Sequence, residues 1–406
     1  MKQWTVLIYS NGNNELEAEE YQRFIELQNV SIEDRIKLIV QIARADSFLV
    51  NVLRPDNNKD MIQEWQGVRR YEIINKEFKL IQDLGKINMA SPNSLTDFII
   101  WGIKKNPSSR IMLIVSGHGA GFVGLMTDST QDRPYMMDLF GLTNCLYSIK
   151  ARTGKSIDCL VFNTCFANMV EVWNEITMIP NKAVKYIIAP ANNLGLEGLS
   201  YDLIISSITR KISLRKSLIE TIKTYNGLCL KASKLLLVDL NKKNFNVLKD
   251  EINNISQVLS QRNNNLRLLL NKWCLFRPSE PLISILDLNE IINDKYFEGH
   301  IAKNNLRNIL EEIVVSPNLT ELHYRINEGP ALYLPLHLKQ YLELRNYYDS
   351  LSFSQDNSWL KIVGGLGNTI GKKDMETNYL DLQAPVEIPI KYVVATIIDQ
   401  NPTMTQ

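Results

Sequence analysis

The sequence predicts an α/β protein with a mostly parallel central sheet and helices on both of its faces. In residues 1–240, apolar runs of strand length alternate with stretches of helical periodicity, the order in which crossover helices join parallel strands. Two runs, 111–115 (IMLIV) and 159–162 (CLVF), are apolar at every position, which is typical of strands covered on both faces. Beyond Asp239 the pattern becomes polar and helically periodic, so a helical C-terminal extension is expected.

Each element of the first half follows from its local pattern. Strands are predicted at 4–9, 37–42, 111–115, 159–162, 184–189 and 235–238, with 48–53 and 68–74 as weaker candidates for a hairpin. Helices are predicted over 91–103, 138–150, 166–176, 203–212 and 217–230. Pro92 suits the start of the first helix, because the N–H group that proline lacks has no helical partner there.

The C-terminal part carries fewer strand signals. Residues 241–270 are Asn-rich and helically periodic, and 330–336 (PALYLPL) read as a late strand. Pro335 is typical of a sheet edge or a strand end. We therefore predict an α/β domain at 1–240, a mainly helical region at 241–363 whose late strands rejoin the sheet, and a tail at 364–406 without an assigned role.

Composition narrows the function classes. The 406 residues include 45 Lys and Arg against 44 Asp and Glu, and the net charge of +1 removes the electrostatic argument for nucleic acid or an anionic membrane as partner. No apolar stretch approaches the ~18 residues of a membrane span, and no signal peptide is evident. The five scattered cysteines form no CxxC pair and predict neither a disulfide framework nor a zinc site. We expect a cytoplasmic monomer.

Two strand ends carry residues suited to covalent chemistry. The run Ser116–Gly121 (SGHGAG) follows 111–115, and Asn163-Thr164-Cys165 follows 159–162. Ligands of open α/β sheets bind at the carboxyl ends of the strands, which places His118 and Cys165 at the functional edge. Cys165 is expected where the next helix begins, and a helix start or a nearby imidazole favours the nucleophilic thiolate. The N–H groups of Gly119 and Cys165 are candidates for an oxyanion hole.

Simpler interpretations of these residues stay open. A lone cysteine at a strand end is more often a small buried hydrophobe, and a histidine between glycines is often only a polar loop residue. A nucleotide-binding signalling domain is disfavoured, because neither GxGxxG nor GxxxxGK occurs. The absence of GxSxG disfavours a serine nucleophile. The remaining histidines, His300, His323 and His337, have no metal-ligand spacing.

Several segments together resemble one family of peptidases. They are Trp4–Glu17, with the Asn-rich turn NGNN; Val115–Gly121; Asp158–Cys165 followed by Asn168, Met169 and Glu171; and Pro330–Leu336 followed by Tyr347, Tyr348 and Trp359. These motifs resemble the clostripain-like cysteine peptidases, which share a clan with caspases, legumain and gingipains. The resemblance covers roughly residues 4 to 362.

The resemblance implies a fold and a reaction. The fold is a caspase-like three-layer αβα sandwich. The reaction is cysteine endopeptidase hydrolysis of a protein or peptide through an acyl-enzyme, with Cys165 as nucleophile and His118 as base and proton donor. No third acidic residue is assigned, because members of the clan often work with a dyad. The alternative is a catalytically weak, peptidase-like scaffold that binds peptides or partner proteins.

The sequence departs from the family pattern at the specificity pocket. Asn163 stands where the family usually has Asp, and Ala191-Asn192-Asn193 replaces a run similar to Ser-Glu-Glu. Because a carboxylate binds Arg or Lys by charge-assisted hydrogen bonds and an amide does not, a pocket lined by Asn163, Ala191 and Asn192 predicts poor cleavage after basic residues. Glu197 or Asp202 are alternative sources of negative charge in this pocket.

The resemblance also raises the question of calcium, on which some relatives depend. Asp128 and Asp132 are acidic loop residues, but no EF-hand spacing occurs. We expect no cofactor.

Overall fold

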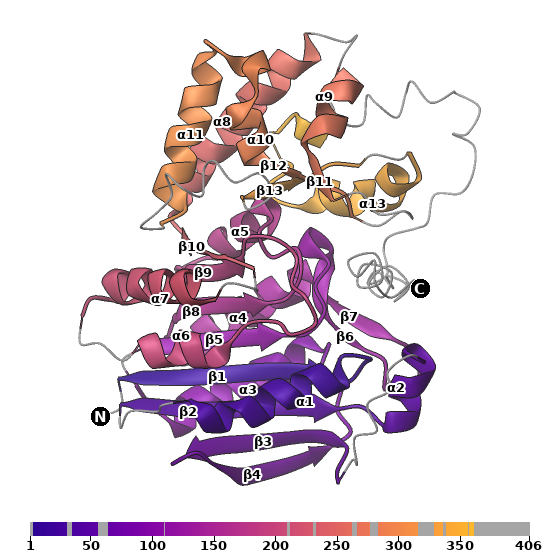
Figure 1. The fold of residues 1–406 in the computed structure, drawn as a ribbon, viewed down its shortest axis with the longest axis vertical. Helices are drawn as coiled ribbons and strands as arrows, with labels where there is room; N and C mark the ends of the chain where they lie inside the picture. The colour runs from indigo at the N-terminus through magenta and orange to yellow at the C-terminus, as the bar shows by residue number, and fades with distance from the viewer. Residues whose placement is uncertain are drawn as a thin grey trace. The chain divides into compact units, whose positions relative to one another are not determined.

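The computed structural model forms two compact units and describes most of the chain (Figure 1). The described residues are 3–30, 35–55, 64–108, 110–208, 212–229, 233–261, 266–276, 283–315, 329–335, 338–355 and 357–360. The first unit comprises the described residues of Met1–Gly119, Gly124–Ala167 and Ile179–Val238, and the second those of Ala120–Val123, Asn168–Met178 and Asp239–Gln406. None of the described helices is long and apolar enough to cross a membrane.

An eight-stranded sheet forms the centre of the first unit, in the order β10-β9-β8-β5-β1-β2-β3-β4. The strands are β1 (Trp4–Gly12), β2 (Ile36–Arg44), β3 (Gly67–Ile74), β4 (Glu77–Gly85), β5 (Arg110–Ser116), β8 (Ile157–Asn163), β9 (Val184–Pro190) and β10 (Leu235–Asp239). Strands β2, β1, β5, β8 and β9 run parallel, whereas β3 and β4 are antiparallel. The mostly parallel sheet predicted from the sequence is confirmed.

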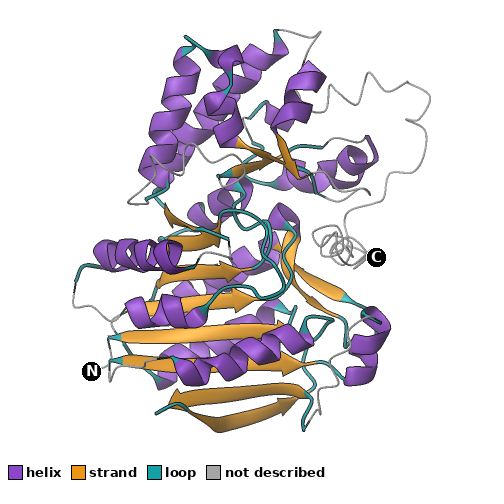
Figure 2. Ribbon diagram, viewed as in Figure 1, coloured by secondary structure: helices purple, strands orange, loops and turns teal. Residues whose placement is uncertain are grey.

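Helices cover both faces of this sheet (Figure 2). The helices of the first unit are α1 (Glu17–Glu26), α2 (Ser47–Leu53), α3 (Pro92–Lys105), α4 (Leu139–Thr153), α6 (Tyr201–Ser207) and α7 (Leu214–Leu228), with the short helix η1 (Leu27–Asn29), and α2 lies beyond the strand ends. In Figure 1, α1, α6 and α7 lie in front of the sheet and α3 and α4 behind it. A small hairpin of β6 (Gly124–Asp128) and β7 (Tyr135–Asp138) adds a two-stranded sheet. The result is the three-layer αβα sandwich that the sequence predicts.

The register of the central strands aligns their carboxyl ends. β1, β5 and β8 are adjacent, and the residue pairs Ser10–Ser116 and Ser116–Asn163 lie opposite one another. All positions of β1 and β8 are buried, as the continuous apolar runs predict. Three chain segments therefore leave the sheet side by side at one edge.

Two predictions about the first unit are wrong. Residues 48–53 form helix α2 instead of a strand, because the Asp46 side chain accepts a hydrogen bond (2.7 Å) from the Phe48 N–H and caps a helix start. The strand at 68–74 does form, but its hairpin partner is β4, which the sequence analysis missed. β4 is an edge strand with mostly half-exposed or exposed positions and several charged residues, so its apolar signal is weak.

The second unit contains a three-stranded sheet and most of the C-terminal helices. Its strands are β11 (Cys274–Phe276), β12 (Ile285–Asp287) and β13 (Ala331–Tyr333), all antiparallel. Its helices are α5 (Val170–Thr177), α8 (Lys242–Ser260), α9 (Leu266–Trp273), α10 (Leu288–Asn293), α11 (Ile301–Ile313) and α13 (Leu338–Ser350), with η2 (Gly121–Val123) and η3 (Lys295–Phe297).

The late strand β13 differs from its prediction. It was expected to rejoin the central sheet, but it pairs with β12 in the separate three-stranded sheet. The predicted division into 1–240, 241–363 and 364–406 stays a prediction, and the tail at 364–406 lies outside the described residues.

A buried carboxyl group joins three elements of the second unit. Glu171 on α5 accepts hydrogen bonds from the Tyr333 N–H (2.8 Å) and the Tyr348 hydroxyl (3.0 Å), and these two rings pack against Phe122. Burial raises the pKa of Glu171 from 4.5 to about 7, and the nearby Glu175 adds to the rise. Oε2 of Glu171 has no hydrogen-bond partner among the described residues. Ionising this group therefore costs free energy in the folded state.

We expect Glu171→Gln to flatten the dependence of stability on pH. The folded-state pKa lies above the unfolded one, so the folded protein binds more protons between pH 4.5 and 7, and wild-type stability falls as pH rises through that window. Above pH 7, ionisation of Glu171 lowers the free energy of unfolding by on the order of 3 kcal/mol. Thermal unfolding at pH 5 and pH 8 measures this pH dependence. From pH 5 to pH 8, the wild type should lose more stability than the variant. Equal losses would contradict the prediction.

Candidate active site

The segments that follow β8, β5 and β1 carry three reactive or titratable side chains. Cys165 follows β8, His118 follows β5 and Glu15 follows β1. Because these strands are parallel neighbours in the order β8-β5-β1, the three segments lie next to one another at the carboxyl edge of the sheet. The structure thus places His118 and Cys165 on adjacent segments, as the sequence predicts.

The histidine and cysteine segments touch at Gly119. A Cβ atom on this glycine would lie 2.3 Å from the carbonyl oxygen of Cys165 and 3.0 Å from its nitrogen, closer than real Cβ contacts allow. The Gly117 N–H also donates to the Asn163 carbonyl (3.3 Å) across the same strand ends. Gly117 has a φ of 144°, a backbone conformation that favours glycine. The glycines beside His118 therefore permit the close approach.

Two backbone N–H groups at this contact are free. Neither the N–H of Gly119 nor that of Cys165 donates a hydrogen bond to any residue that the structure describes. Gly119 and Leu125 form an isolated antiparallel β-bridge. The hydrogen bond of this bridge is donated by the Met126 N–H to the His118 carbonyl (2.9 Å). Two free donors on adjoining segments are what the binding of a developing oxyanion requires.

The environment of Cys165 differs from the expected one. Helix α5 begins at Val170, and Cys165 lies in the preceding turns, so the prediction that the cysteine sits at the helix start is wrong. The turn is tight, with Phe166 at a φ of 56°. Burial raises the pKa of the Cys165 thiol to about 11, and a hydrogen bond with the Leu194 backbone offsets only part of this effect. The thiol is thus neutral at pH 7.

His118 has an acidic neighbour that the sequence analysis did not assign. Its Nε2 atom lies 2.9 Å from Oε1 of Glu15, and each of the two side chains is 5% exposed. Burial is the largest single effect and would raise the pKa of Glu15, but the charge of the His118 imidazolium, backbone hydrogen bonding and the charge of Arg54 together outweigh it and hold that pKa below its usual value. The only sequence signal was the position of Glu15 directly after the Asn-rich turn.

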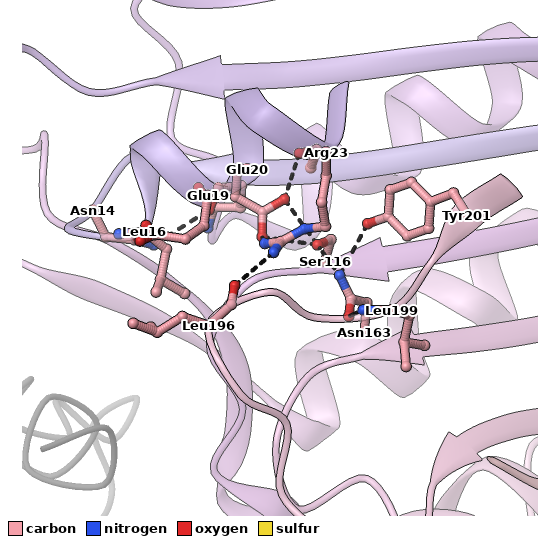
Figure 3. Close-up of polar contacts among 12 residues, drawn as sticks. Asn14, Leu16, Glu19, Glu20, Arg23, Ser116, Asn163, Leu196, Leu199 and Tyr201 are labelled. Atoms are coloured by element: carbon pink, nitrogen blue, oxygen red, sulfur yellow. Dashed lines mark hydrogen bonds and ion pairs between the residues drawn. The ribbon is translucent and has the colours of Figure 1, made fainter. Parts of the chain in front are cut away.

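Asn163 belongs to a closed cluster of polar groups (Figure 3). Its Nδ2 group donates to the Ser116 hydroxyl (2.7 Å) and the Tyr201 hydroxyl (3.0 Å). Its Oδ1 atom accepts from the Leu199 N–H (2.8 Å). Asn163 is buried, so its amide is fully used by the protein itself.

A buried ion pair adjoins this cluster. Glu20 on α1 accepts hydrogen bonds from Ser116 Oγ (2.8 Å) and Ser10 Oγ (2.6 Å), and it pairs with the guanidinium of Arg23. Arg23 Nη1 also donates to the Leu196 carbonyl (2.9 Å; Figure 3). The sequence analysis named Glu197 or Asp202 as alternative acids, but Glu197 is exposed. The carboxylate that reaches the cluster is Glu20, and its charge is balanced by Arg23.

The other two predicted pocket residues lie after β9. The Ala191 N–H donates to the Lys234 carbonyl (2.7 Å), and the Asn192 N–H donates to the Ser233 hydroxyl (3.2 Å). Asn192 is partly exposed, and its Oδ1 atom has no hydrogen-bond partner among the described residues. The structure thus ties Ala191 and Asn192 to the segment before β10, whereas Asn163 joins the cluster of Figure 3.

The acidic loop residues do not fit a calcium site. Asp128 is buried and accepts from Asn13 Nδ2 (2.8 Å), the Met89 N–H (2.7 Å) and the Thr130 N–H (2.9 Å). Its oxygens are therefore engaged by donors of the protein, and Asp132 is exposed. Within the described ranges, no group of three or more His, Cys, Asp or Glu side chains gathers in a way that would hold a metal ion.

Solved structures with the same fold belong to C11 proteases. The chain is similar to a secreted C11 cysteine protease from Bacteroides thetaiotaomicron in complex with an irreversible peptide inhibitor, with 13% identity, a TM-score of 0.62 and coverage of 88% of this chain and 99% of that chain. It is also similar to an inactive zymogen C11 protease from Parabacteroides distasonis, with 13% identity, a TM-score of 0.63 and coverage of 88% and 98%. No curated protein sequence matches the chain.

These comparisons correct one expectation and identify the family. The cytoplasmic location expected from the sequence is contradicted, because the similar structures include a C11 protease described as secreted. Scattered cysteines and the lack of an evident signal peptide were insufficient grounds for it. The family model of the clostripain family matches residues 41–372, well over half of the sequence. The chain therefore belongs to the clostripain family of cysteine proteases.

Proposed function

We propose that this protein is a cysteine endopeptidase in which Cys165 attacks the peptide carbonyl and His118 transfers the protons. The observation that carries the proposal is the meeting of the two segments at Gly119, where backbone of the histidine segment approaches the Cys165 backbone. Parallel neighbours β5 and β8 bring the segments to the same edge. Both residue types are those that nucleophilic catalysis by a thiol requires.

The reaction begins from the neutral thiol. As Sγ of Cys165 bonds to the carbonyl carbon, the imidazole of His118 accepts the thiol proton. The oxyanion is bound by the N–H groups of Gly119 and Cys165. The C–N bond then breaks, and His118 gives its proton to the departing amine. Water, deprotonated by His118, hydrolyses the thioester and restores the thiol. No cofactor takes part in this sequence.

The substrate class follows from relatives and from the pocket. One similar structure holds a peptide inhibitor, which supports a peptide or protein as substrate, and we propose that the enzyme acts as a monomer without nucleic acid or membrane partners. Asn163 is neutral and used by its own neighbours, and Glu20 is balanced by Arg23. We therefore propose weak cleavage after Arg or Lys and a preference for neutral polar or small residues.

A peptidase-like scaffold that binds peptides with little turnover is the second candidate. Two observations favour it: the protonated state of the partly buried Cys165 thiol and the closed hydrogen-bond cluster around Asn163. Activity measurements separate the two candidates. A scaffold binds peptides but does not release cleaved product, whereas a peptidase does both.

Replacing the nucleophile is the direct test. We expect Cys165→Ala and His118→Ala to reduce turnover by about three orders of magnitude or more, since both groups act on one transition state. The matched control is Cys229→Ala, a partly buried cysteine at the end of α7, which should keep full activity. Proteomic mapping of new peptide termini in the presence of each variant provides the readout. New termini that persist with Cys165→Ala would exclude Cys165 as nucleophile.

Gly119→Ala should damage both stability and catalysis. Its Cβ would force the Cys165 backbone to move, which we expect to cost about 1–3 kcal/mol and to lower turnover at least tenfold. Gly227→Ala on α7 is the matched control, because nothing lies within 4 Å of the added Cβ, and it should be neutral or up to about 1 kcal/mol more stable. Urea unfolding and turnover measure both effects; a Gly119→Ala enzyme with normal activity would refute the proposed contact.

An aspartate at position 163 should increase cleavage after Arg and Lys. A panel of fluorogenic peptides that differ only at the residue before the cleaved bond should show low kcat/KM for Arg and Lys and higher values for neutral residues. We expect Asn163→Asp to raise kcat/KM for the Arg peptide about tenfold, or about 1.4 kcal/mol, because it adds a second carboxylate to the Glu20 cluster whose charge Arg23 alone does not balance. A wild type that strongly prefers Arg would contradict the specificity proposal and leave the catalytic one intact.

A further inference from the structure

We propose that Glu15 is a positioning residue whose carboxylate holds Nε2 of His118 and thereby turns Nδ1 toward the thiol of Cys165. The inference rests on the proposed function, because it assigns a role within the same site. It adds a residue that neither the family resemblance nor the sequence spacing assigned. The inference is based on the order of three neighbouring segments, which carry a thiol, an imidazole and a carboxylate side by side.

The fold produces that order directly. Strand β5 lies between β8 and β1, so the segment of His118 lies between those of Cys165 and Glu15. An imidazole in this middle place has one ring nitrogen available for each side. Since Nε2 lies 2.9 Å from the Glu15 carboxylate, Nδ1 is the nitrogen left for the thiol.

The backbone of Glu15 is fixed on both sides. Asn14 Oδ1 accepts from the Leu16 N–H (2.9 Å), and Asn14 Nδ2 donates to the Thr127 carbonyl (2.9 Å). Asn11 Nδ2 donates to the same carbonyl (2.7 Å). The Asn-rich turn is thus anchored to β6, and the carboxylate that follows it is presented at a defined place. Such anchoring is what positioning of a catalytic group requires.

The pair is isolated from other partners. Each side chain is 5% exposed, and neither Nε2 nor Oε1 has a hydrogen-bond partner among the described residues, so the 2.9 Å contact between them is an ion pair without hydrogen-bond geometry. Without that contact, each atom would be buried with no polar partner at all, which costs free energy. Charge attraction and the absence of another polar partner among the described residues therefore both keep Glu15 beside His118.

The charges around the pair are few. On the side of α2, Arg54 acts on Glu15 and also pairs with Glu19 of α1 (2.9 Å). On the side of β8, the neighbouring segment carries the Cys165 thiol, whose pKa of about 11 leaves it neutral at pH 7. The carboxylate of Glu15 stays ionised, because the imidazolium lowers its pKa. An ionised Glu15 favours a proton on Nε2 and leaves Nδ1 as the basic nitrogen.

The first test does not depend on catalysis. In a Cys165→Ala background, NMR of the ¹⁵N-labelled imidazoles, with His118 assigned by its own substitution, gives the tautomer. We expect neutral His118 to carry its proton on Nε2, and Glu15→Ala to move the proton toward Nδ1 because the acceptor that faces Nε2 is lost. A proton on Nδ1 with Glu15 present, or the same tautomer in both proteins, would overturn the proposal even if the protein proves to have no peptidase activity.

The second test uses the active enzyme. We expect Glu15→Gln and Glu15→Ala to lower kcat about 10- to 100-fold with little change in KM, and the acid limb of the kcat/KM profile to move to lower pH. The matched control is Glu17→Gln, which removes another buried carboxylate, one that pairs with Arg44 (2.6 Å). The control should lose stability but keep the pH profile. An identical profile in the Glu15 variants would show a merely structural role and defeat the proposal.

Discussion

Buried carboxylates at the start of α1 impose the constraint on which the edge of the sheet depends. A carboxylate removed from water costs several kcal/mol unless a cation and further donors satisfy it. Each acid of this segment meets a different partner: Glu15 meets His118, Glu17 meets Arg44, Glu19 meets Arg54 and Glu20 meets Arg23. The partners come from β2, the end of α2, α1 itself and the segment after β5, so satisfying these charges fixes how those elements meet at the carboxyl edge of the sheet.

The free-energy cost of burying a charge also affects the chemistry at Cys165. The sequence suggested a thiolate at a helix start, whereas the structure has a neutral thiol in turns that precede α5. Without a preformed thiolate, catalysis depends on a base that is correctly oriented at the moment of attack. The orientation of His118 then matters more than its proximity alone, and orientation is what an anchored neighbouring carboxylate supplies.

Much of the site could be predicted from local pattern. The apolar runs at 111–115 and 159–162 identify β5 and β8, and the glycines around His118 and the turn at Cys165 identify their functional ends. Glu15 was missed because its pairing depends on the lateral order of strands, which no local pattern encodes. The edge strand β4 and the helix α2 were missed because exposure and a single capping Asp outweigh apolar periodicity.

The segment between β9 and α6 is held at several points, among them Arg23 Nη1 at the Leu196 carbonyl and Asn163 Oδ1 at the Leu199 N–H. Both anchors come from the scaffold of the first unit, one from α1 and one from the end of β8. A segment fastened in this way has little freedom to move. If peptides bind beside it, as the proposed function requires, discrimination among ligands arises from the fit to a preformed surface, and small rigid inhibitors lose little affinity to reorganisation of the protein.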